Sequence, residues 1–151
     1  MDYRFFECTE SPGLFFQILP EDWKTAIIPF WPKYRETTRV FVISISGKVV
    51  VGGLVFSTVS PDTMFYKEEA QSWFNNGYLY LAYIWVDEHY RGKGLGSIWL
   101  KQIHSFYNKQ KFWLAIEDYA LLKFYSANGY NLVKEIQGEE NAEWILARPV
   151  D

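Results

Sequence analysis

The chain has 151 residues, a length that fits one compact domain and leaves little room for a second. About half of its residues are hydrophobic and 20% are aromatic, which supports a packed core and excludes a largely disordered chain. The net charge is −3 and no block of five Lys or Arg residues occurs, which argues against nucleic-acid binding through a basic face. We therefore expect a single domain over residues 1–151 that binds no nucleic acid.

The cysteine count and the hydropathy pattern indicate where in the cell the protein is expected and whether it is expected to bind a metal or a membrane. Cys8 is the one cysteine, so no disulfide can form within the chain, and no Cys/His cluster has metal-ligand spacing. The first residues lack the basic region and long apolar stretch of a signal peptide, and no uncharged apolar run reaches about 18 residues. These features predict a cytoplasmic protein without a bound metal and without a membrane partner.

The first elements along the chain are predicted to be short. The apolar and aromatic segment Leu14–Leu19 is typical of a strand. Pro20 followed by two acidic residues is the pattern of a helix start, because acids in the first turn favour the positive end of the helix dipole. Pro29 and Pro32 are expected to end this helix early.

A hairpin and a helical insert are predicted next. Two β-rich runs, Val40–Ser46 and Val49–Ser57, flank a short glycine-containing turn. Gly52 and Gly53 inside the second run indicate a bulge or a close backbone approach. The segment Pro61–Asn76 is predicted to be a helical insert that ends at the following glycine, and its aromatic residues either line an acceptor pocket or simply pack onto the sheet.

The second half of the chain alternates strands with helices, which predicts a mixed α/β sheet. Tyr78–Val86 is apolar at nearly every position, as expected for a central strand covered on both faces. An amphipathic helix over Leu95–Lys109 leads to a strand at Phe112–Ile116. Asp118 can cap the next helix, Tyr119–Asn128. Two further strands are predicted at Asn131–Gln137 and Glu143–Ala147.

A glycine-rich turn, Arg91–Gly96 (RGKGLG), follows the strongest strand and opens the amphipathic helix. Glycines allow a tight turn and the close approach of a ligand, and the first N–H groups of a helix have no partners within it. Together with the positive helix end and the side chains of Arg91 and Lys93, the turn predicts a phosphate or pyrophosphate site. The structural alternative is a surface turn that binds nothing. The spacing fits neither the P-loop nor the dinucleotide fingerprint.

This turn resembles the [QR]-x-x-G-x-[GA] signature of the GNAT acetyltransferases, carried here by Arg91, Gly94 and Gly96. The preceding residues, Val86–Gly92, are similar to the family's V-D-P-x-Y-R-G, with Glu88 in place of proline. Both features follow a strong strand, as they do in the family. We expect the missing proline to loosen the turn slightly without removing the anion site.

A second region, Ala120–Tyr130, resembles the family's C-terminal A-x-x-F-Y-x-x-x-G-F pattern at nearly the same spacing. Many members carry Asn where this chain has Asp118, and that Asn contacts the cofactor. An aspartate can still cap the helix, but it cannot donate an amide hydrogen bond. The motifs cover Tyr78–Tyr130, and the remainder is similar to the family only in its order of elements.

The resemblance implies a GNAT-like acyl-CoA N-acyltransferase fold in which the sheet splays between its fourth and fifth strands. Acetyl-CoA would enter that gap, and its pantetheine would pair with the backbone of Ile84, Trp85 and Val86 like an added strand. Its pyrophosphate would lie on backbone N–H groups of the turn and the helix start. The expected cofactor-binding residues are therefore Ile84, Trp85, Val86, Arg91, Gly92, Lys93, Gly94, Leu95, Gly96, Ser97 and Asp118.

The resemblance also implies the reaction, which is direct attack of a primary amine on acetyl-CoA in a ternary complex. Tyr125 would be the general acid that protonates the leaving sulfur. A lysine-like amine is protonated at neutral pH, so a base is needed. Candidate bases stay open and comprise Asp87, Glu117, Glu68, Glu69 and a water relay. The acceptor stays open between a small molecule and a peptide, and the family makes a homodimer possible.

Two other readings remain. The first is a non-catalytic acyl-CoA-binding module that keeps the fold and has lost turnover. The second is a phosphate-binding domain unrelated to acetyl transfer. Binding of coenzyme A in preference to ATP or NAD separates the second reading from the others, and turnover separates the first reading from an enzyme.

Overall fold

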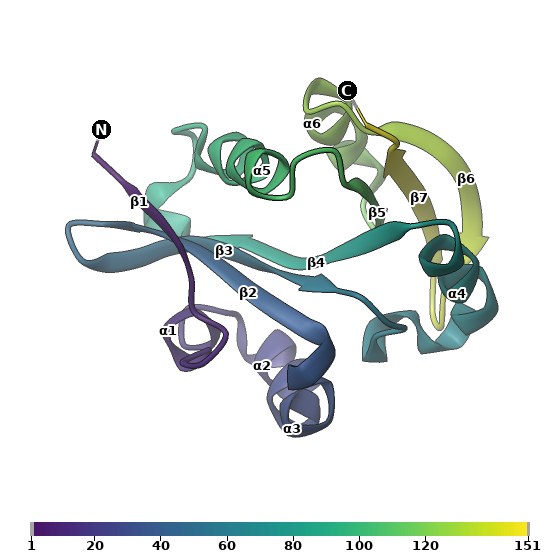
Figure 1. Cartoon of the computed structure of the whole chain (residues 1–151), viewed down its shortest axis with the longest axis horizontal. Coiled ribbons are helices and arrows are strands. Elements are labelled where there is room, and N and C mark those ends of the chain that lie inside the picture. Colours follow the sequence, from purple (N-terminus) through teal and green to yellow (C-terminus); the bar gives the residue numbers. More distant parts are fainter. Residues whose placement is uncertain (1, 151) are drawn as a thin grey trace.

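A mixed sheet with helices on both faces forms the centre of this computed structural model, which describes residues 2–150 (Figure 1). Within these residues the strand order is β1-β2-β3-β4-β5-β7-β6. The β4–β5 pair is parallel and the other neighbouring pairs are antiparallel. The strands are β1 (Arg4–Glu7), β2 (Thr38–Ile45), β3 (Lys48–Phe56), β4 (Tyr78–Val86), β5 (Lys111–Ile116), β6 (Asn131–Gln137) and β7 (Ala142–Arg148).

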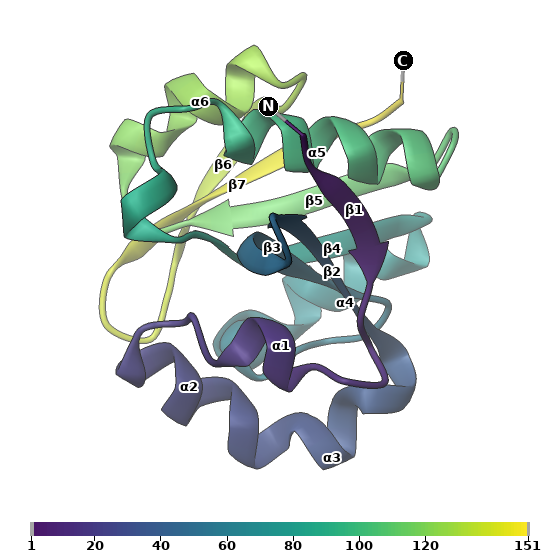
Figure 2. The same cartoon turned by 90° about the vertical axis from the view of Figure 1, so that its left-hand side faces the viewer.

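The helices are divided between the two faces of this sheet, as Figure 2 shows. One face is covered by α1 (Gly13–Phe16), α2 (Glu21–Ile27) and α3 (Trp31–Tyr34). The insert, made of the 3-10 helix η3 (Pro61–Tyr66) and α4 (Lys67–Asn75), packs on the same face. The opposite face is covered by α5 (Leu95–Phe106) and α6 (Leu122–Ala127). Each helix therefore buries its apolar side against one face of the strands.

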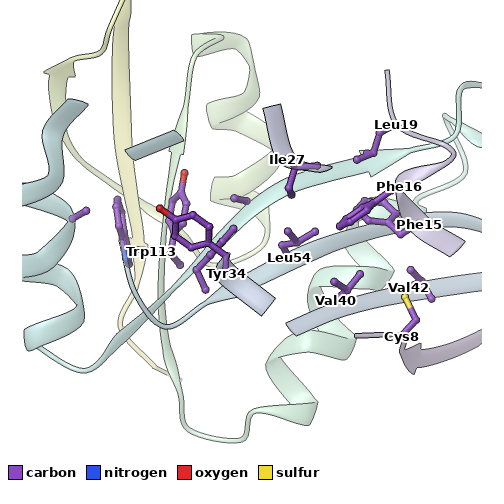
Figure 3. Packing of buried hydrophobic residues seen from close by; sticks show 14 of the residues in the cluster. Cys8, Phe15, Phe16, Leu19, Ile27, Tyr34, Val40, Val42, Leu54 and Trp113 are labelled. Atoms are coloured by element: carbon purple, nitrogen blue, oxygen red, sulfur yellow. The ribbon is translucent and has the colours of Figure 1, made fainter. Parts of the chain in front are cut away.

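The core has two layers because side chains alternate along each strand. In β2, Val40 and Val42 point toward α1, while Phe41 and Ile43 point toward α5. Figure 3 shows the first layer, in which Phe15, Phe16 and Leu19 pack near the valines and Trp113 lies farther along the sheet. The second layer is built around Trp99, Leu100 and Ile103 of α5. A strand covered on both faces reads as a continuous apolar run, which is why β4 was recognisable in the sequence.

One predicted strand is wrong. Leu14–Leu19 forms no strand, because α1 occupies Gly13–Phe16 and a turn follows it. A helical turn places Phe15, Phe16 and Leu19 on one side, where all three are buried. The edge position beside β2 is instead taken by β1, whose short sequence gives little periodic signal.

The other predicted elements are confirmed. The hairpin, the insert and the two C-terminal strands lie close to their predicted bounds. The amphipathic helix ends at Phe106, slightly earlier than predicted. Around Pro29 and Pro32 the chain forms short helical turns, which continue until β2 begins. Gly129 has a φ of +93°, the left-handed conformation that ends the preceding helix.

Candidate functional site

The β4 and β5 strands separate partway along their length. They pair at Tyr78 with Lys111, Leu79 with Phe112, and Tyr80 with Trp113, and not beyond. From Leu81 onward the β4 edge that faces β5 has no strand partner. The predicted splay between the fourth and fifth strands is therefore confirmed. Such an edge can pair with an extended ligand, and Ile84, Trp85 and Val86 lie along it.

A bulge in β4 lies within this open stretch. Gly52 pairs with Trp85 and Leu54 pairs with Ala82, so Gly53 faces two residues, Tyr83 and Ile84. Tyr83 has a φ of +56°, a conformation that a non-glycine residue adopts at a cost of about 1–2 kcal/mol. The extra residue puts Ala82 and Tyr83 on the same face of the sheet, toward α1–α3. The bulge thus directs the Tyr83 side chain away from the helix layer of α5.

The glycine-rich turn leads into α5 with its backbone amides unpaired. Gly92 and Gly94 have φ values of +77° and +75°, and nothing lies within 4 Å of a Cβ built on either. The first backbone bond back from the helix runs from the Ile98 N–H to the Gly94 carbonyl at 3.1 Å. The N–H groups of Leu95, Gly96 and Ser97 therefore have no backbone partner within residues 2–150. An open, glycine-lined helix start of this kind fits a pyrophosphate.

Gly96 serves a different purpose from the other glycines of the turn. A Cβ on Gly96 would lie 3.1 Å from Cζ of Phe124, so this glycine lets α5 approach α6 closely. Asn128 reinforces the same junction, because its Nδ2 donates to Ser97 Oγ at 3.2 Å and to the Phe124 carbonyl at 2.9 Å. No local sequence pattern marks this contact, because Asn128 follows Ser97 by 31 positions. The junction fixes the start of α5 relative to α6.

Arg91 is held against the end of β4. Its Nε donates to the Val86 carbonyl at 3.1 Å, and its guanidinium lies 4.4 Å from the centre of the Trp85 ring. These contacts use one of the five N–H donors and the flat face of the group. The other nitrogens make no hydrogen bond within residues 2–150, which suits contact with a phosphate. Lys93 is exposed in the same turn.

Asp87, one of the candidate bases, makes contacts that stabilise the turn after β4. Its Oδ1 accepts from the His89 backbone N–H at 2.9 Å, and its Oδ2 lies 3.6 Å from Lys48 Nζ. The hydrogen bond from His89 and the nearby charges lower the pKa of Asp87. A carboxylate stabilised in its ionised form is a weak base. We conclude that Asp87 orders the turn.

Tyr125 lies on α6 and is buried, with 8% of its surface exposed. Burial raises the pKa of its phenol to about 12, so the group stays protonated at neutral pH. Its ring contacts those of Phe124 and Tyr130, and its hydroxyl makes no hydrogen bond within residues 2–150. These properties suit a proton donor. Asp118, by contrast, uses Oδ1 to accept from the Ala120 N–H at 2.9 Å, as the predicted helix cap.

A second group of polar side chains gathers on the α1–α3 face, around the open part of β4. Tyr80 Oη donates to Asp62 Oδ2 at 2.5 Å, and Tyr66 Oη donates to Glu143 Oε1 at 2.7 Å. We call this group, defined by its six members, the carboxyl–phenol cluster. The members are Asp62 and Tyr66 from the insert, Tyr80 and Tyr83 from β4, Glu117 after β5, and Glu143 from β7.

Sequence reasoning found only one member of this cluster, Glu117, as a candidate base. The other members are isolated in sequence, so no local pattern marks them. The candidate bases of the insert lie elsewhere: Glu69 accepts from Trp73 Nε1 and pairs with Lys134, each at 2.9 Å. Glu68 is exposed on α4.

The fold and this gap define the architecture of the acyl-CoA N-acyltransferases. Residues 6–130 match the model of the Acetyltransferase (GNAT) family, so the chain belongs to that family and is an acyltransferase. Members use acetyl-CoA as the acetyl donor. No curated protein matches the chain.

Several solved structures share this fold. The ribosomal-protein-S18-alanine N-acetyltransferase of Escherichia coli aligns with a TM-score of 0.70 and 18% identity, over 99% of this chain and 94% of that one. A Corynebacterium glutamicum structure titled histone acetyltransferase HPA2 and related acetyltransferase gives a TM-score of 0.69 at 14% identity, over 100% and 98% of the two chains. A Bacillus anthracis chain solved with acetyl coenzyme A gives 0.58 at 15% identity, over 80% and 68%.

Two further observations concern metals and membranes. Within residues 2–150, no three His, Cys, Asp or Glu side chains are grouped so that they could hold a metal ion. Over the same part of the chain, no helix is both long enough and apolar enough to cross a membrane.

Proposed function

We propose that the protein moves an acetyl group from acetyl-CoA to a primary amine of a small molecule or peptide, by direct attack in a ternary complex. The observation that carries the proposal is the open β4 edge, which is followed after a short turn by an unpaired, glycine-lined helix start. The edge offers pairing for the amide groups of pantetheine, and the helix start offers N–H donors for the pyrophosphate. The family match supports the same donor.

The residues that hold the donor follow from this geometry. The backbone of Ile84, Trp85 and Val86 would align the pantetheine arm along β4. The N–H groups from Arg91 to Ser97 and the guanidinium of Arg91 would neutralise the pyrophosphate. Bound acetyl-CoA supplies an acetyl group activated as a thioester. The protein then orients the attacking nitrogen and controls the protons that move.

Tyr125 supports the proton balance of the reaction. A protonated amine first gives up one proton to water so that its nitrogen can attack. As the new N–C bond forms and the C–S bond breaks, the nitrogen releases a second proton to water and the departing sulfur takes one from Tyr125. A phenol with a pKa of about 12 keeps its proton at neutral pH and can donate it to a thiolate as charge develops on sulfur. Tyr125 recovers its proton from solvent after the product leaves.

Calorimetric titration tests the donor site first. The purified protein is titrated with acetyl-CoA, with ATP and NAD as controls, and a panel of amines is then assayed for released thiol. Selective binding of acetyl-CoA with thiol release that depends on the amine supports the proposal. Selective binding without turnover would instead support a non-catalytic acyl-CoA-binding module. Preference for ATP or NAD would overturn the proposal.

A further inference from the structure

The carboxyl–phenol cluster brings negative charge to the side of the gap opposite the α5 layer. Its members come from both sides of the splay, since Tyr80 and Tyr83 belong to β4 and Glu117 directly follows β5. Glu143 lies on β7, one residue from Trp144, which pairs with Ile116 at the end of β5. The cluster therefore surrounds the region where β4 and β5 separate.

The groups of the cluster lie close enough to act on one another. Burial raises the pKa of Tyr83, and the charges of Asp62 and Glu117 raise it further. Burial also raises the pKa of Glu143, and the charges of Glu117 and Asp62 add to the effect of burial. Asp62 is exposed when the whole residue is considered. Its two carboxylate oxygens nevertheless accept hydrogen bonds, Oδ1 from Ser60 Oγ and Oδ2 from Tyr80 Oη.

The ion pairs between described residues do not involve these carboxylates, which belong to Asp62, Glu117 and Glu143. No Lys, Arg or His side chain contributes to the pKa shifts of Asp62, Tyr83 or Glu143. Gathering like charges without a counter-charge is costly, so a cationic ligand would be strongly favoured here. The carboxylates do not converge as metal ligands do, which suits charges spread along an organic molecule.

Other features of the same face fit an amine with an alkyl chain. Trp23 makes edge contacts with Tyr83 and Trp85, with ring centres 5.7 Å and 5.2 Å apart, and aromatic rings attract both methylene groups and ammonium ions. The ring of Trp113, whose centre lies 4.4 Å from that of Tyr80, adds a further aromatic surface on this face.

We propose that the carboxyl–phenol cluster is the acceptor site and that the acceptor is a diamine or polyamine. One nitrogen would reach the β4 bulge for acetylation while a second, still protonated, would bind the carboxylates of the cluster. Tyr83 would lie between the two positions, because the bulge directs its side chain to the acceptor face. This inference rests on the proposed acetyl transfer and assigns it an acceptor class.

Matched acceptors of equal chain length test the charge requirement. The wild-type protein is assayed for thiol release with 1,4-diaminobutane and with 1-aminobutane, and the binding of each amine is also measured by calorimetry in the presence of coenzyme A. We expect kcat/KM and affinity to favour the diamine by about tenfold or more, and the preference to shrink as salt is added.

Charge-neutral variants locate the site. Asp62→Asn and Glu143→Gln keep oxygen atoms that can accept from Tyr80 and Tyr66, so the fold is preserved while one charge is lost. Each variant should raise KM for the diamine about tenfold and leave KM for the monoamine nearly unchanged. Glu10→Gln is the matched control, because Glu10 is exposed after β1, at the far edge of the sheet.

The outcomes separate this inference from the proposed function. Equal binding and turnover of the two amines, or a diamine preference that survives both substitutions, would overturn the acceptor assignment while leaving acetyl transfer intact. If no amine releases thiol, the proposed function fails, and the calorimetric comparison of the two amines still decides whether the cluster binds a dication.

Discussion

Trp99 of α5 lies so close to Gly53 of β3 that a Cβ on the glycine would be 2.6 Å from the indole Cη2. The indole Nε1 donates to the Phe41 carbonyl at 3.0 Å, and the Trp99 side chain is fully buried. Gly53 also faces the β4 bulge. This contact thus packs α5, whose first turn forms the proposed anion site, against the part of the sheet that carries the bulge.

Gly53→Ala should destabilise the protein by about 1–3 kcal/mol, because the added methyl group overpacks a position with no free volume. Chemical denaturation measures the free energy of unfolding. Gly13→Ala is the control, since nothing lies within 4 Å of a Cβ there, and we expect a change within about 0.5 kcal/mol. Equal stability of wild type and Gly53→Ala would show that α5 can shift freely on the sheet.

Arg91→Lys should weaken acetyl-CoA binding about tenfold, because lysine cannot stack on Trp85, bind the Val86 carbonyl and contact a phosphate together. Calorimetry measures the affinity. The loss should be much smaller for acetyl-pantetheine, which lacks the pyrophosphate. A loss of the same size for both ligands would mean that Arg91 acts on the pantetheine or on the fold.

Tyr125→Phe should lower kcat by about 10²-fold or more with little change in acetyl-CoA affinity, because it removes only the proton donor. The rate should also become more dependent on the thiol leaving group, so a thioester of a more acidic thiol should recover part of it. A variant with unchanged kcat would remove Tyr125 from the proposed chemistry.

Glu143→Gln should raise the melting temperature at pH 7 by about 1–3 °C. The pKa of Glu143 is raised in the folded protein, so folding opposes its ionised form, and this cost appears once the pH exceeds the ordinary pKa of the carboxyl. The difference between the two proteins should vanish near pH 4 in a thermal scan. A lower melting temperature for the variant at pH 7 would contradict uncompensated charge in the cluster.

Stability should fall as the pH rises above about 10. The folded-state pKa of Tyr125 is about 12, higher than in the unfolded chain, because burial opposes ionisation of the phenol. The stability that depends on this neutral phenol is therefore fully present below pH 10 and is lost as the pH rises toward 12. The expected loss for this tyrosine is about 1.4 kcal/mol per pH unit within that window. Denaturation at several pH values checks this, and Tyr125→Phe should flatten the decline.

The anion turn and the strand that leads into it were predictable because their physics is local. Glycines at fixed spacing, a helix start and a continuous apolar run leave their signature within about 20 neighbouring residues. The helix cap predicted at Asp118 is equally local and is confirmed. The sequence alone therefore determined the family and the order of most elements, and it predicted where the proposed donor site lies.

Tertiary structure decided the rest. The strand status of Arg4–Glu7 depends on pairing with β2, and the helical state of the Leu14–Leu19 region depends on burial of its phenylalanines against β3. The carboxyl–phenol cluster, the proposed acceptor site, is the clearest case, because Asp62, Glu117 and Glu143 come from three distant segments. Their proximity results from strand order and from the splay of β4 and β5. Packing between distant segments leaves no periodic or spacing signal in one sequence, so only the folded chain shows where these charges meet.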